Sequence, residues 1–113
     1  MKFKDEMTDG VVIFHVKGKI INTEDGTEFF GRLHEHLNRN AKNIVINMSR
    51  VEWLTSQGLG IFIRARDAVE KSHGRLALAK VEGKAAQLMI ITRLTSTFEH
   101  YDSTEEALNA LKN

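Results

Sequence analysis

Hydrophobic residues occur along the chain in short unbroken runs and in longer stretches with helical spacing. The run Val11–Val16 is rich in β-branched residues and is followed by Gly18, which predicts a strand buried on both faces that ends there. Ile20-Ile21 would either extend this strand or cover the end of the sheet. Asn43–Asn47 has the same character. Lys2 and Lys4 would discourage pairing with another sheet, so the strand in which they lie is predicted at an edge. The shorter predicted strands are Lys2–Met7, Arg75–Ala79 and Thr97–Tyr101.

Apolar residues three and four positions apart predict helices that each turn one face to the core. The first helix follows possible N-caps in Asn22–Asp25, and the second runs from about Gln57 to Lys71 after a polar turn that follows Asn47. The third spans Glu82–Ile91. The last begins at Ser103, which forms a predicted capping box with the glutamate three residues later. The predicted inward-facing residues are Phe29, Phe30, Leu33, Leu37, Leu59, Phe62, Ile63, Val69, Ala85, Leu88, Met89, Ala107, Leu108 and Leu111.

The order of these segments indicates the fold class. Asp9-Gly10 is a hairpin signal between the first two strands, and strands then alternate with helices. Alternation of this kind implies parallel strands joined by right-handed crossovers. The sequence therefore predicts a single α/β domain over residues 1–113, with a mixed, mostly parallel sheet of about five strands and four helices.

Composition narrows the function classes. The chain has 113 residues, enough for one domain with one core. The lack of cysteine excludes disulfides, thiolate metal ligands and cysteine nucleophiles. A net charge of +1 gives no electrostatic indication of a nucleic-acid or membrane partner. No apolar run approaches the roughly 20 residues of a membrane span and no secretory signal opens the chain, so a cytoplasmic protein is expected.

Candidate chemical sites are weak. The glycines in Gly58-Leu59-Gly60 lack the spacing of a nucleotide-binding loop. On a helix, His34 and His36 would point about 200° apart and could not share an ion, so no metal or cofactor is predicted. Ser56 is not flanked as in a nucleophile elbow, and the carboxylates fall mostly at helix starts or on polar helix faces. The sequence therefore does not predict an enzyme.

The hydroxyl groups before the second helix allow two interpretations. Thr55 or Ser56 would serve as its N-cap, which contributes about 1 kcal/mol. A hydroxyl at a helix start is also a favourable phosphorylation site, because free N–H groups and the helix dipole stabilise the added phosphate. Thr55 and Ser56 are therefore both candidate phosphoacceptors.

In this region the chain resembles the STAS domain of bacterial anti-sigma-factor antagonists. That family has a strand, an aromatic-containing turn and then Asp-Ser-Ser/Thr/Ala-Gly-Leu-Gly at the start of a helix. The matching run here is Val45–Gly60. The resemblance covers essentially the whole chain, and it includes Val16-Lys17-Gly18, Leu88–Leu94 with Phe98, and Tyr101–Leu108.

The resemblance implies a regulatory protein that binds a kinase-type anti-sigma factor and thereby releases a sigma factor. In the family, the kinase phosphorylates the second hydroxyl of the Ser-Ser/Thr pair, which abolishes binding, and a phosphatase restores it. That position is Gln57 here, which cannot be phosphorylated. A partner-switch protein without the usual acceptor is therefore predicted. The predicted partner-binding residues are Thr55, Ser56, Gln57, Gly58, Leu59, Ile21 and Asn22.

Two other functions stay open at this stage. The chain could be an interaction or scaffold module of a sensory or transport complex that phosphorylation does not control. It could also be a small-ligand-binding or enzymatic α/β domain, which would require a deep apolar pocket beside acids or bases with perturbed pKa values.

Overall fold

The computed structural model describes residues 1–94 and 96–112. The predicted order of strands and helices is confirmed, and so is the α/β class. The elements are β1 (Lys2–Thr8), β2 (Val11–Ile20), a 3-10 turn η1 (Thr23–Gly26), α1 (Thr27–Asn38), β3 (Asn43–Leu54), α2 (Ser56–Lys71), β4 (Arg75–Ala79), α3 (Gly83–Ile91), β5 (Glu99–Tyr101) and α4 (Thr104–Leu111).

The strands form one mixed sheet in the order β1-β2-β3-β4-β5. β1 pairs antiparallel with β2, and the later neighbours are parallel. The predicted hairpin is present, with Asp9 at φ 53° and Gly10 at φ 79°. Positive φ at both central residues is the geometry that matches the twist of two antiparallel strands.

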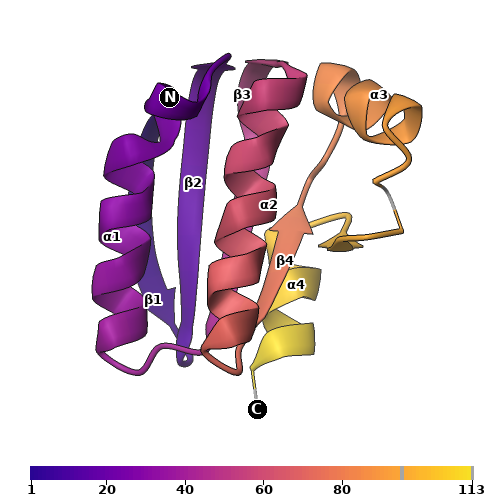
Figure 1. Ribbon diagram of the computed structural model, residues 1–113. Helices are drawn as coiled ribbons and strands as arrows, with labels where there is room; N and C mark the ends of the chain where they lie inside the picture. The colour runs from indigo at the N-terminus through magenta and orange to yellow at the C-terminus, as the bar shows by residue number, and fades with distance from the viewer. Residues whose placement is uncertain (95, 113) are drawn as a thin grey trace.

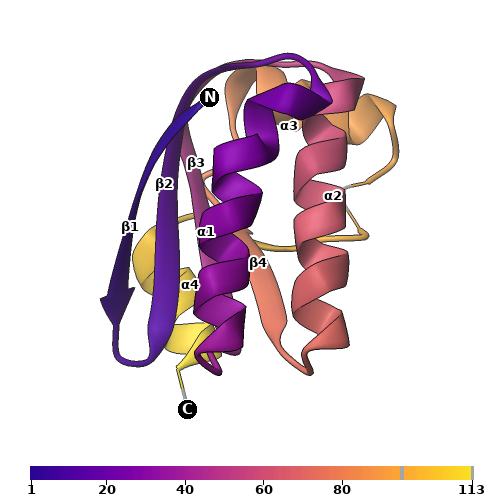
Figure 2. The same cartoon turned by 60° about the vertical axis from the view of Figure 1, so that its left-hand side comes forward.

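Helices cover both faces of the sheet, but unequally. Figures 1 and 2 show α1 and α2 side by side on one face and α4 on the other. The larger core lies under α1, α2 and α3, where the ring centroids of Phe14 and Phe29 are 4.9 Å apart and those of Phe29 and Phe62 are 6.1 Å apart. The smaller core joins Ala107 and Leu111 of α4 to the first half of β2 and β3 and to Ala77 and Ala79 of β4. The second half of β2 and β3 is therefore left uncovered on that side.

Two strands are longer than predicted. The polar turn predicted after Asn47 is wrong, because β3 continues to Leu54. Gly18 does not end β2 either; it has φ 95° at an irregularity in the pairing. Of the two alternatives for Ile20-Ile21, the structure shows the extension, because the strand continues to Ile20, opposite Leu54. In β3 the side chains of Met48 and Leu54 are buried while Arg50 is exposed, so the segment is half polar because only one face meets the core.

Several details of the predicted elements also differ. The last strand begins at Glu99, not Thr97, and α2 begins one residue earlier than predicted. The Ser103 hydroxyl accepts from the Glu106 N–H at 3.0 Å, as the predicted N-cap requires. Among the residues predicted to face inward, those only half-buried are Phe30, Leu37, Ile63, Leu88 and Leu108, whereas Ile61 and Ala65 are fully buried.

Charged side chains fix the edge strand β1 to α1. The Asp5 carboxylate accepts from Arg32 Nε at 2.8 Å and lies 2.6 Å from His36 Nε2. Burial raises the pKa of Asp5, but the hydrogen bonds of His36 and Arg32 outweigh that effect, so the pKa lies below its ordinary value. The ionised carboxylate is therefore part of what holds β1 in place.

Candidate functional site at the start of helix α2

Thr55 joins the end of β3 to the end of β2. Its backbone N–H donates to the Ile20 carbonyl at 3.2 Å, and its hydroxyl donates to the Ile21 carbonyl. The same hydroxyl oxygen accepts from the Gly58 N–H at 3.1 Å, which makes Thr55 the N-cap of α2. Of the two N-caps that the sequence allowed, the structure therefore selects Thr55.

Gly58 lets the first turn of α2 lie against β2. A Cβ at this position would be 2.8 Å from the Ile20 carbonyl carbon and closer still to its oxygen. Leu59 is 1% exposed and packs in the larger core. Gly58 and Leu59 are both buried and pack beneath the exposed residues of the first turn of α2, and a role for these two residues in partner binding stays a prediction.

A second hydrogen-bonded loop sets the position of Ile21 and Asn22. The Asp25 carboxylate accepts from the Ile21 N–H at 2.8 Å and from the Asn22 N–H at 3.2 Å. The Asn22 side chain accepts in return from the Asp25 N–H at 3.3 Å. The N–H groups of Ile21 and Asn22 lower the pKa of Asp25, so the carboxylate stays ionised and keeps the loop ordered.

These two loops present one mixed surface at the end of the sheet where β2 and β3 finish, which lies uppermost in Figure 1. Ser56 and Gln57 are exposed on the first turn of α2. Ile21 is 45% exposed and Trp53 is 44% exposed, although both are large apolar side chains. The corner surface is defined here as Ile21, Asn22, Trp53, Ser56 and Gln57.

Trp53 is the site residue that the sequence analysis missed. The sequence places it in a polar turn, whereas in the structure it is the penultimate residue of β3, two positions before Thr55. The Lys84 Nζ, at the start of α3, lies 4.6 Å from the centroid of its ring, a cation–π contact. The available signal was an aromatic residue in an otherwise polar segment beside the predicted site, since exposed tryptophans are concentrated in binding surfaces.

The described residues offer little for other chemistry. Within residues 1–94 and 96–112 there is no group of three or more His, Cys, Asp or Glu side chains that could hold a metal ion. His34 is exposed, whereas His36 binds Asp5. No helix in this part of the chain has both the length and the apolar character needed to cross a bilayer.

Comparison with known proteins agrees with this geometry. A sequence model of the STAS domain matches residues 2–107. The chain belongs to the STAS domain family. Over 112 residues it is 21% identical to BtrV of Bordetella bronchiseptica, which is described as a candidate anti-sigma factor antagonist; the match covers 99% of this chain and 96% of that protein.

Solved structures show the same fold. A candidate anti-sigma factor antagonist from Thermotoga maritima is 26% identical, with a TM-score of 0.84 over 98% of this chain and 95% of that chain. An anti-sigma factor antagonist from Mycobacterium paratuberculosis is 24% identical, with a TM-score of 0.83 over 99% and 94% of the two chains. Unphosphorylated SpoIIAA, also an anti-sigma factor antagonist, is 18% identical, with a TM-score of 0.77 over 99% of each chain. The predicted resemblance is confirmed.

Proposed function

We propose that this STAS domain is a regulatory protein that binds a protein partner through the corner surface, as an anti-sigma-factor antagonist in a bacterial partner switch. One observation carries the proposal: two large apolar side chains, Ile21 and Trp53, are exposed beside Ser56 and Gln57 on a support held by hydrogen bonds. Exposed apolar groups rimmed by polar ones are typical of protein-binding surfaces. The relatives described as anti-sigma factor antagonists support the class of partner, a kinase-type anti-sigma factor.

A binding role suits the chemistry of the corner better than catalysis. The Asp25 carboxylate lies in the turn that follows Ile21 and Asn22, and the backbone N–H groups of those two residues bind it. Its lowered pKa makes it a poor general base at neutral pH. The Thr55 hydroxyl is likewise engaged as donor and acceptor. Asp25 and Thr55 are therefore used to build the surface, and Ser56 is left as its exposed hydroxyl.

The contact can be tested with a matched pair of substitutions. Ile21→Ser removes an apolar side chain from the corner surface, and Met7→Ser removes one that is 59% exposed at the far end of β1. Calorimetric titration with a purified kinase-type anti-sigma factor should show binding weakened about tenfold or more by Ile21→Ser and unchanged by Met7→Ser. Equal losses from the two variants would contradict the assignment of the surface.

Phosphorylation, if it controls this domain, is proposed at Ser56 and not at Thr55. Modification of the Thr55 hydroxyl would break its bonds to the Ile21 carbonyl and the Gly58 N–H. Ser56 is exposed and is the first residue of α2, where the helix dipole favours a phosphate. The charge of that phosphate would face the partner.

Incubation with the kinase-type partner and ATP, followed by mass spectrometric mapping, tests this assignment. Label should be found on Ser56 and lost in Ser56→Ala. A Gln57→Ser variant supplies a control hydroxyl at the position that matches the usual acceptor. If only that variant is labelled, the native domain has no acceptor and binds constitutively. Label on Thr55 would contradict the structural argument.

A second candidate function follows from Gln57. Its neutral amide cannot accept a phosphate, which favours an interaction module of a sensory or transport complex that no kinase controls. A photo-crosslinking amino acid at position 57, compared with one at the exposed Glu105 on α4, distinguishes the two functions. A specific adduct with a kinase-type ATPase supports the partner switch, whereas an adduct with a sensory or transport subunit supports the second function.

A further inference from the structure

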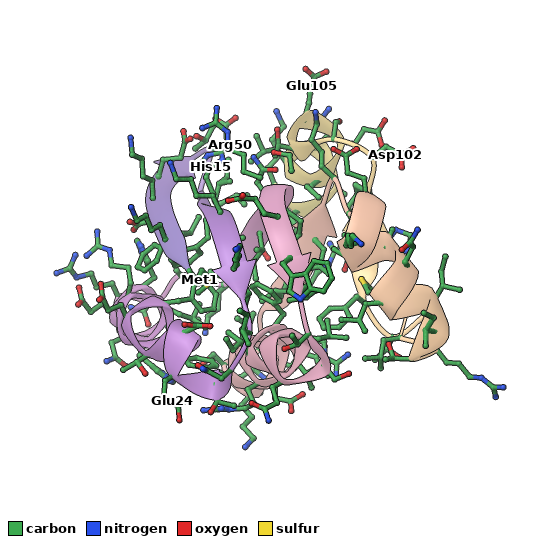
Figure 3. The ribbon with its side chains drawn as sticks, turned by 90° about the horizontal axis from the view of Figure 1, so that it is seen from above. Met1, His15, Glu24, Arg50, Asp102 and Glu105 are labelled. Atoms are coloured by element: carbon green, nitrogen blue, oxygen red, sulfur yellow. The ribbon has the colours of Figure 1, made fainter. Side chains whose placement is uncertain are left out.

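A basic hollow of about 560 Å³ lies on the outer face of β1, β2 and β3. Lys2, Lys4, Lys17 and Arg50 line it, and Asn47 and Ser49 add polar groups. Figure 3 shows His15 and Arg50 close together on the side of the sheet away from α1 and α2. α4 packs on the first half of the strands, so the hollow remains open beside it. This feature is called the basic groove below.

The strand register places three of these cations in one row. Lys2 is directly opposite Lys17, and Lys17 is directly opposite Arg50. Neighbouring strands are about 4.8 Å apart, so the row spans roughly 10 Å. Like charges at directly opposite positions destabilise a sheet. None of the three is in an ion pair with another residue of the described ranges, although the whole chain has a net charge of only +1.

Protection of the sheet edge does not explain the row. Lysines on an edge strand block pairing with another chain, which accounts for Lys2. Lys17 lies on β2 and is paired on both sides, with Lys2 of β1 and Arg50 of β3, whereas β3 is paired with β4 only as far as Asn47. Lys17, the middle cation of the row, therefore lies where edge protection is not needed.

A bulge in β3 turns the Arg50 side chain into the basic groove. His15 pairs with Asn47 and Lys17 pairs with Arg50, so β3 has one more residue than β2 between these pairs. Because side chains normally alternate between faces, adjacent residues would point to opposite sides. The extra residue changes that alternation, and both Ser49 and Arg50 line the groove.

A hydrogen-bond network fixes the polar side chains that line the basic groove. The Ser49 N–H donates to Asn47 Oδ1 at 3.0 Å, which turns the Asn47 amide nitrogen toward His15 Nδ1 at 2.9 Å. His15 Nε2 then faces the Glu6 carboxylate at 2.7 Å and donates to it. Glu6 is thus occupied by His15, and none of the described residues that line the groove carries a carboxylate.

We propose that the basic groove binds a small polyanion that carries two or more phosphate or carboxylate groups. Its volume falls within the roughly 300–1,000 Å³ that is usual for small-molecule sites. The row of Lys2, Lys17 and Arg50 can contact negative groups several ångströms apart, and the bound charge removes the repulsion within the row. The proposal does not depend on the corner surface, which contains none of these residues.

Two probes distinguish the source of the negative charge: inorganic tripolyphosphate and citrate. Each is titrated into the full chain and followed by calorimetry and by backbone amide NMR shifts. Saturable binding should move the amide signals of Lys17, Asn47 and Ser49, and the tighter probe identifies phosphate or carboxylate as the preferred group. Lys17→Gln and Arg50→Gln should each weaken it about tenfold, because each removes a charge-assisted hydrogen bond. Lys71→Gln, in the last turn of α2, removes the same charge elsewhere and should leave binding unchanged.

The ligand-free protein supplies a second measurement. Lys17→Gln removes a cation that is opposite two others, so we expect the melting temperature to rise by about 4 °C while anion binding weakens. A purely structural role for Lys17 would instead lower the melting temperature. Three results would overturn the proposal: binding of both probes weaker than about 1 mM, an equal loss in Lys71→Gln, or tighter binding of an Asp/Glu-rich peptide in the groove than of either small anion.

Discussion

The contact between Gly58 and β2 gives a sharp test of how the corner is built. In Gly58→Ala the new methyl carbon would be 2.8 Å from the Ile20 carbonyl carbon, which belongs to backbone and cannot rotate away. Overpacking of this kind costs about 1–3 kcal/mol. If the strand end moves, the bond from the Thr55 N–H to the Ile20 carbonyl is also lost, at about 1 kcal/mol. Alanine gains about 1 kcal/mol in helix propensity, which leaves a net loss of about 2 kcal/mol.

Gly60 in the same helix provides the control. A Cβ there meets no atom within 4 Å, so Gly60→Ala should stabilise the domain by about 0.5–1 kcal/mol. Urea denaturation of the two variants, with the slope checked against the parent chain, measures both values. The essential result is that the two substitutions change the free energy of unfolding in opposite directions. If Gly58→Ala is as stable as Gly60→Ala, close packing of α2 on β2 is not what requires a glycine at position 58.

Three further outcomes are expected. Thr55→Val removes the cap and the bond to the Ile21 carbonyl and should cost about 1–2 kcal/mol in urea denaturation; a value near zero would contradict its joining role. Because the folded-state pKa of Asp5 is lowered, its contribution to stability is present above its ordinary value of 3.8 and is lost as pH falls through the folded pKa; Asp5→Asn should remove that part of the acid dependence, and an unchanged pH profile would refute it. Gln57→Ser should make binding to a kinase-type partner sensitive to ATP, measured by native gel shift, whereas an ATP-independent complex would count against the partner switch.

Local rules were sufficient to predict the order of elements. The Asp9-Gly10 turn, the apolar run of β2 and the stripe on α2 each follow from nearby residues, and each is present. The start of α4 at Ser103 was also predictable, because an N-cap is a local contact. These features need no knowledge of which segments meet in space.

The features that were not predicted depend on contacts between distant segments. Trp53 was assigned to a turn because its neighbours are polar, but pairing with Lys19 of β2 keeps the segment extended. The row of Lys2, Lys17 and Arg50 is likewise invisible in the sequence, where these residues are far apart. Strand register created both features, and register is set by the whole sheet.

The construction of the corner bears on how this domain is controlled. Thr55 and Asp25 hold the two loops through backbone hydrogen bonds, so the surface is shaped before a partner arrives. Such preorganisation reduces the entropy lost on binding. In a corner that is already ordered, a phosphate would act mainly through its charge and bulk at the contact and need not refold the loop. Under the proposed function, a neutral Gln57 makes the binding-competent shape the resting state of the domain, and we expect any control by phosphorylation to act at Ser56.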